Sequence, residues 1–169
     1  MITADKVLSR LPTYRDEWQL VTKRQYVPDI INEICYAHRL YGKYYDTFSD
    51  YFYDRDPLVV ADRLFSFCKS YIHYREEPVD SQTSAIPTGI LHRGYGDCKH
   101  YALFNAGVIG SLNRLYGCCF DASFCFVGYG RAKEPYHVYV SIEDGDWEIW
   151  LDPTPGSGST PSVIVRKPV

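Results

Sequence analysis

The spacing of apolar residues changes once along the chain, at Gly117, and this change limits the possible folds more than any other feature. Before Gly117, apolar residues recur at helical spacing in residues 28–42, 56–74 and 98–116. After it come short runs rich in β-branched and aromatic residues, at 118–130, 136–142 and 147–152. Helices followed by consecutive strands predict an α+β domain.

Turn-forming residues delimit these elements. Asp56 and Pro57 suit the start of the second helix, and Gly117 suits a left-handed end for the third. The Asp-Gly pair in "EDGD" (143–146) predicts a hairpin, with its turn centred between Asp and Gly, so an antiparallel sheet is expected. The stretch 75–97, rich in Pro, Gly, Ser and Thr, is expected to form a long functional loop.

Length and charge exclude several classes of protein. The 169 residues fit one domain, and the formal net charge of −3 provides no electrostatic footprint for nucleic acid. The first 18 residues contain no apolar signal segment, and no later stretch approaches a membrane span. We therefore expect no nucleic-acid or membrane partner, and a cytoplasmic or virion-associated location. The sequence does not indicate an oligomeric state.

Cys98 has a different setting from the other five cysteines. No Cys-x-x-Cys pair occurs, and the five histidines lie at no metal-like spacing from the thiols, so neither a metal nor a cofactor is expected. Cys98 follows Gly94, Gly96 and Asp97 at the start of the third predicted helix. A helix N-terminus favours a thiolate, and its unpaired N–H groups can hold an oxyanion. The glycines either admit a substrate or simply form a turn.

A histidine and a carboxylate occupy suitable positions in the predicted hairpin. His137 and Asp152 are each about seven residues from the expected turn centre, which predicts near cross-strand partners on one face of the sheet. A cysteine nucleophile needs such an imidazole, with a third group that orients it. His100 is rejected as the base because residues two apart do not share a helix face. Lys99 and Asp97 are expected to be solvated, although Asp97 is also a possible helix cap.

Taken together, "GYGDCKHYALF", "YHVYVSI" and "WEIWLDPTPG" resemble the transglutaminase-like superfamily of compact bacterial or phage-borne type. The resemblance implies a papain-like fold, with Cys98 as nucleophile, His137 as general base and acid, and Asp152 as the orienting group. It spans residues 56–156, the expected catalytic core. Residues 1–55 are then a helical extension packed on the core, and residues 157–169 a flexible tail, with an edge strand as the alternative for its apolar end.

The same resemblance suggests an oxyanion hole. In "SQTSAIPTGILHRGYGDC", Gln82 precedes Pro87 and the cysteine in the order seen in compact relatives. Gln82 is therefore the expected side-chain donor, beside the backbone N–H of Cys98. A glutamine in a polar loop that simply faces solvent is an equally weighted alternative.

The resemblance implies a cysteine enzyme that acts by acyl transfer on peptide or protein amide bonds. Hydrolysis, as in a protease or amidase, is the first expectation because no amine site is evident. Transamidation of protein glutamine is the second. The alternative from another class is a catalytically idle structural or assembly protein, such as a component of a phage particle.

Overall fold

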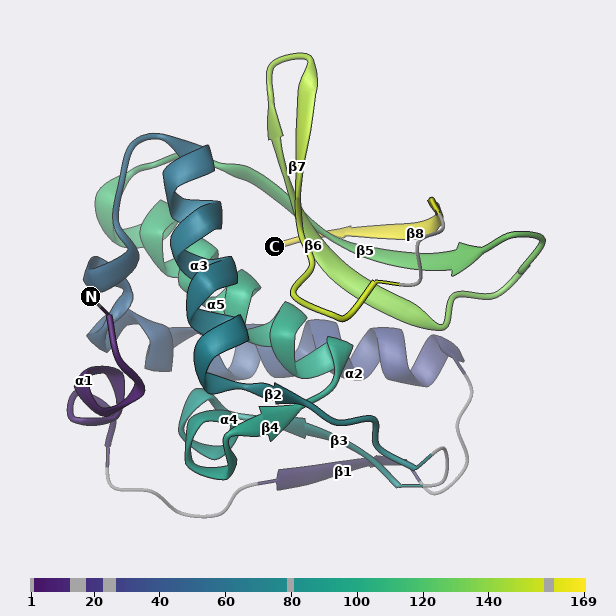
Figure 1. The fold of residues 1–169 in the computed structure, drawn as a ribbon, viewed down its shortest axis with the longest axis horizontal. Coiled ribbons are helices and arrows are strands. Elements are labelled where there is room, and N and C mark those ends of the chain that lie inside the picture. The colour runs from purple at the N-terminus through teal and green to yellow at the C-terminus, as the bar shows by residue number, and fades with distance from the viewer. Residues whose placement is uncertain (1, 13–17, 23–26, 79–80, 157–159) are drawn as a thin grey trace.

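The computed structural model describes residues 2–12, 18–22, 27–78, 81–156 and 160–169, which form an α+β fold (Figure 1). The helices are α1 (Ala4–Leu8), α2 (Val27–Tyr41), the 3-10 helices η1 (Gly42–Thr47) and η2 (Ser49–Phe52), α3 (Pro57–Tyr71), α4 (Pro87–Arg93) and α5 (Cys98–Tyr116). The strands are β1 (Trp18–Thr22), β2 (His73–Tyr74), β3 (Gln82–Ala85), β4 (Tyr95–Gly96), β5 (Asp121–Tyr129), β6 (His137–Asp144), β7 (Trp147–Leu151) and β8 (Pro161–Pro168). None of the helices in these ranges is both long and apolar enough to span a membrane.

Helix α5 is the centre of the fold and is buried along most of its length. It contacts α2, both 3-10 helices and strands β5 and β6. Phe104 of α5 stacks on Phe67 of α3 with ring centroids 5.3 Å apart, and on Phe48 at 6.0 Å. Val7 of α1, Ile34 of α2 and Phe48, which lies between η1 and η2, belong to the same buried core as these rings, so the N-terminal helices pack with the rest of the chain.

The three predicted helices are confirmed as α2, α3 and α5. The carboxylate of Asp56 caps α3 by accepting from the Leu58 amide at 2.9 Å. Gly117 ends α5 with φ +61°, the left-handed conformation that glycine adopts without strain.

Strands β5 to β8 form an antiparallel sheet in the order β7-β6-β5-β8. The predicted hairpin is confirmed as β6–β7. Asp144 pairs with Trp147, so the turn consists of Gly145 and Asp146 and is centred one residue later than expected. One face of the sheet packs on the helices through residues such as Phe124 and Val140, which are fully buried.

The expectation of a continuous loop over residues 75–97 is wrong. This stretch contains β3, which pairs antiparallel with β1, then helix α4, and then β4, which pairs parallel with β2. Gly94 ends α4 with φ +65°. A side chain at Gly96 would collide with His100, since an added Cβ would lie 2.6 Å from the His100 Cβ. Both glycines therefore have structural roles here, a helix end and a close packing contact.

The end of the chain is not wholly a flexible tail. Residues 161–168 form β8, which pairs with β5 from Ser123 to Tyr129. Residues 157–159 lie outside the described part of the chain. The edge-strand alternative is thus confirmed for the apolar end.

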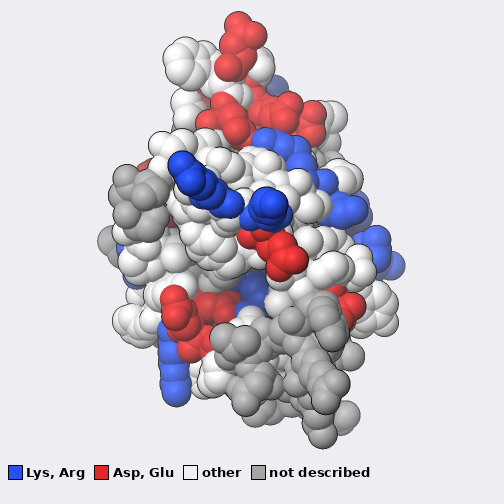
Figure 2. All heavy atoms as spheres, turned by 90° about the vertical axis from the view of Figure 1, so that its right-hand side faces the viewer, with Lys and Arg blue, Asp and Glu red and all other residues white. Residues whose placement is uncertain are grey.

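The β6–β7 hairpin extends beyond the body of the molecule and carries acidic side chains at its free end (Figures 1 and 2). Its exposed acidic residues are Glu143, Asp144, Asp146 and Glu148. Arg166 of β8 lies 2.7 Å from Glu148 and 3.3 Å from Glu143, and so links the hairpin near its turn to the opposite edge strand.

Candidate functional site

Cys98 is the first residue of α5, and the residues around it fix that start. The Asp97 carboxylate accepts from the Lys99 amide at 3.0 Å, and His100 Nδ1 lies 3.2 Å from the Asp97 backbone nitrogen, so the two residues form a capping box. The predicted cap at Asp97 is confirmed. Cys98 is a free, half-buried thiol at the positive end of the helix dipole.

His137 and Asp152 lie together at the far end of the β6–β7 hairpin from the turn. His137 Nε2 lies 2.7 Å from Asp152 Oδ2. Val140 is opposite Leu151, so continuing the register places Asp152 opposite Tyr139, with His137 two residues further along the same face. The pair is therefore diagonal and not directly opposite, because the turn lies one residue later than expected.

The described surroundings hold this pair in place. The backbone amide of Thr154 donates to the other Asp152 oxygen, Oδ1, at 3.1 Å. The side chain of His137 is only 8% exposed, whereas that of Asp152 is 26% exposed. Because one Asp152 oxygen is bonded to His137 and the other to the Thr154 amide, the orientation of the carboxylate toward the imidazole is fixed.

The charge of His137 depends on both of its neighbours. Burial alone would lower its pKa, because burial disfavours the charged imidazolium. Hydrogen bonds with Asp152 and Cys98, together with the negative charges of these groups, outweigh burial and raise the pKa of His137 to about 9. Because Nε2 is bonded to Asp152, the ring presents Nδ1 to Cys98. An imidazolium in that position stabilises a thiolate.

Two pockets meet at the thiol. One is mostly apolar and lies against α2, and the other is more polar and extends toward Glu76 and Thr154. Cys98, Tyr136 and His137 line both pockets. The sulfur and the imidazole therefore lie where the two pockets adjoin.

Gln82, the expected oxyanion donor, lines the apolar pocket together with Cys98. Its amide nitrogen donates to the carbonyls of Glu77, at 3.1 Å, and Pro78, at 3.2 Å. Its oxygen accepts from Lys99 Nζ at 2.6 Å. Both amide hydrogens are thus engaged with the main chain, and donation to an oxyanion would require one of these bonds to break.

A buried ionic cluster lies immediately behind the start of α5. Lys99 and Asp97 were expected to be solvated, but they are 4% and 5% exposed. Lys99 Nζ forms an ion pair with Asp97 and lies 3.3 Å from Glu77 Oε2. Glu77 also accepts from the backbone and side chain of Thr83. Burial would raise the pKa of Asp97, but hydrogen bonds and charge from His100 and Lys99 hold it well below its usual range.

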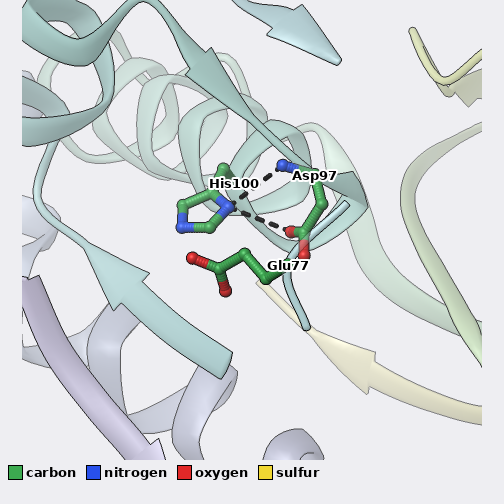
Figure 3. Close-up of side chains that lie close together, drawn as sticks. All are labelled: Glu77, Asp97 and His100. Carbon is green, nitrogen blue, oxygen red and sulfur yellow. Dashed lines mark hydrogen bonds and ion pairs between the residues drawn. The ribbon is translucent and has the colours of Figure 1, made fainter. Parts of the chain in front are cut away.

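Glu77, Asp97 and His100 have ligand atoms within 4.8 Å of one another, a spacing at which such groups can hold a metal ion (Figure 3). Their surroundings favour a different role. The Lys99 ammonium already lies against both carboxylates, and His100 Nδ1 lies 2.9 Å from Asp97 Oδ1 (Figure 3). The cluster therefore carries its own cation. It also shows what His100 does: its ring is fully buried against Asp97 and belongs to the cap.

The structure thus brings Cys98, His137 and Asp152 together, with Gln82 on the wall of the same cleft. Sequence reasoning missed Glu77 and the buried role of Lys99. The capping-box pattern of Asp97 and His100 signalled part of this cluster, but nothing in the sequence links it to a glutamate twenty residues earlier. No family model, curated protein or solved structure matches this chain.

Proposed function

We propose that the protein is a cysteine-dependent hydrolase of amide bonds, with a transglutaminase-like, papain-like arrangement of nucleophile, base and orienting acid. One observation carries the proposal. The imidazole of His137 lies between Asp152, at 2.7 Å, and the thiol at the N-terminus of α5, and two pockets adjoin this pair. Cysteine nucleophiles are activated by this arrangement.

The reaction begins with the ion pair of thiolate and imidazolium. The sulfur attacks the carbonyl carbon of the amide, a C–S bond forms, and the carbonyl electrons move to oxygen. The backbone N–H of Cys98 is the first donor to that oxyanion, because the first amides of a helix have no carbonyl partner within it. Gln82 is the proposed second donor, once it is released from one main-chain carbonyl.

Breakdown of the tetrahedral intermediate breaks the C–N bond. His137 gives its proton to the leaving amine, which departs neutral and leaves a thioester on Cys98. Water then attacks the thioester while His137 takes one of its protons. Collapse of this second intermediate releases the carboxylic acid and restores the ion pair. Throughout, Asp152 keeps the imidazole oriented and stabilises its positive charge.

The reactivity of two thiols in the same molecule tests the first step. Cys119 is exposed, and among the residues that the structure describes its sulfur has the Gly117 carbonyl, at 3.5 Å, as its hydrogen-bond partner. At pH 6, iodoacetamide should modify Cys98 at least about tenfold faster than Cys119, because only a thiolate is nucleophilic. Site-resolved mass spectrometry measures both rates. His137→Ala should remove the advantage of Cys98, whereas His92→Ala, a change at an exposed histidine of α4, should not.

Hydrolysis itself is tested with a mixture of peptide anilides. Wild-type protein should release the aniline, and Cys98→Ala should reduce release to background. If Cys98 and Cys119 are alkylated at equal rates and no aniline is released, the proposed enzymatic function is contradicted and a structural or assembly role is favoured.

A further inference from the structure

The apolar pocket beside the thiol has walls from two parts of the chain that are far apart in sequence. Helix α2 supplies Ile30 and Ile34, four residues apart and hence on one face of the helix. The sheet supplies Phe126 and Val138, which pair across β5 and β6. The cavity between these walls has a volume of about 80 Å³.

The polar groups on this wall are already engaged. Lys99 lines the pocket, but its ammonium is held by Asp97, Glu77 and Gln82. Gln82 in turn bonds to Lys99 and to main-chain carbonyls. A charged group that entered the pocket would lose water and meet few free polar partners, which is unfavourable. An apolar group would gain from burial.

The two sides of the cleft therefore differ. On one side of Cys98 and His137 lies the apolar pocket, and on the other lies a pocket lined by groups such as Glu76, Asp152 and Thr154. The wall from α2 lies outside residues 56–156, so it is a feature of this chain's own N-terminal segment.

We infer that the pocket formed by α2, Phe126 and Val138 is a specificity site that takes a bulky apolar side chain carried by the substrate next to the scissile amide. The inference rests on the proposed function, because it assigns the reacting carbonyl to Cys98. Its substrates are amides with a leucine-like or aromatic group, and acidic or very small groups at that position are disfavoured.

Thiol alkylation tests the pocket without requiring turnover. One pair of probes is the chloromethyl ketones of acetyl-leucine and acetyl-glycine, which differ by an isobutyl group on the acyl side. The other pair is N-isobutyl chloroacetamide and chloroacetamide, in which the isobutyl group lies on nitrogen. In at least one pair, the isobutyl probe should modify Cys98 roughly tenfold faster or more, the discrimination that an apolar pocket provides.

Substitutions that fill the pocket test whether the preference for the isobutyl probe arises there. Ile30→Trp should lower the ratio of the two rates toward one. Leu40→Trp is the matched control, since Leu40 lies on the same helix, is 49% exposed and does not line the pocket. Val27→Trp, at the start of α2, is the second filling variant if Ile30→Trp does not fold.

The outcomes separate this inference from the proposed function. If the isobutyl probe and its smaller counterpart alkylate Cys98 at nearly equal rates in both pairs, while Cys98 is still alkylated faster than Cys119, the specificity site is overturned and the proposed nucleophile stands. A high ratio that the filling variant leaves unchanged also overturns the specificity site. If Cys98 is no faster than Cys119 with any probe, the proposed function fails and the inference fails with it.

Discussion

Asp152 determines which ring nitrogen of His137 faces Cys98. Its carboxylate accepts from Nε2, so the other ring nitrogen remains available to the sulfur of Cys98. The pKa of His137 is raised to about 9, whereas burial and the neighbouring arginines lower the pKa of His38 to about 4. The two histidines therefore show opposite effects of their surroundings within one molecule.

We predict that NMR titration will give a midpoint near 9 for His137 and near 4 for His38. Asp152→Asn and Cys98→Ala should each lower the midpoint of His137, because each removes a group that stabilises the imidazolium. His38 is the internal control and should not move. Because the pKa of His137 is raised on folding, its contribution to stability is complete below about pH 6.5 and is lost as the pH rises through about 9. A midpoint for His137 near 6.5 in wild-type protein would contradict the ion pair.

Lys99 is the buried cation of the cluster behind Cys98. Replacing it with Met should lower the free energy of unfolding at pH 7 by about 3–5 kcal/mol, because two carboxylates would lose their counter-ion. Lys69→Met, an exposed change on α3, is the control and should alter stability by less than about 0.5 kcal/mol. Urea denaturation measures both changes.

The effect of Lys99→Met should shrink in acid. The pKa of Asp97 is lowered in the folded protein, so its stabilising contribution is present above the ordinary carboxyl pKa near 4 and declines below it. An equal loss of stability at pH 7 and pH 3.5 would show that packing, and not charge, explains the effect.

At the scale of elements, α5 contains a matched pair of glycines. A methyl group at Gly107 would collide with the ring of Tyr45, whereas at Gly110 it would lie 3.4 Å from the nearest atom of His38. In the interior of a helix, alanine is more favourable than glycine by about 1 kcal/mol in helix propensity, and this applies at both sites. Packing therefore decides the sign of the change in stability.

Gly107→Ala should destabilise the protein by about 1–3 kcal/mol, the usual cost of overpacking a core. Gly110→Ala should be neutral or stabilising by up to about 1 kcal/mol. Denaturant midpoints of the two variants measure the difference. Equal effects at both positions would mean that Tyr45 yields without cost.

Element length also explains which elements the sequence predicted. The long helices α2, α3 and α5 show helical periodicity over four or more turns, so their existence and ends were predictable. Strands β2 and β4 have two residues each and α4 has seven, too few to establish a period. The short strands depend on pairing with segments elsewhere in the chain, β4 with β2 and β3 with β1.

At the scale of the whole molecule, β8 completes the sheet. It covers the edge of β5, where Cys125 and Val127 are fully buried, and the backbone amide of Val169 donates to the Ala122 carbonyl at 2.9 Å. An uncovered strand edge promotes association between molecules.

We predict that truncation before Pro161 will lower the unfolding midpoint and cause concentration-dependent self-association. Size-exclusion chromatography and urea denaturation measure the two effects. Lys167→Ala, an exposed change within the strand, is the control for a general effect of altering the terminus and should leave both unchanged. A truncated protein as stable and monomeric as the full chain would show that β8 contributes nothing.

The α+β class, the long helices, the hairpin and the position of Cys98 at a helix start were all predictable from the order of residues along the chain. These features follow from local periodicity and from turn and capping residues, whose physical effects reach only a few positions along the chain. The same-face relation of His137 and Asp152 was also predictable, because side chains alternate along each strand.

The exact register of His137 and Asp152 depends on where the hairpin turn falls. By contrast, the burial of Lys99 between Asp97 and Glu77, and the apolar wall that α2 places beside the thiol, depend on tertiary packing. Each of these brings together residues that are far apart in sequence. Burial and charge pairing depend on what surrounds a side chain in space, and a residue's neighbours along the chain do not specify those surroundings.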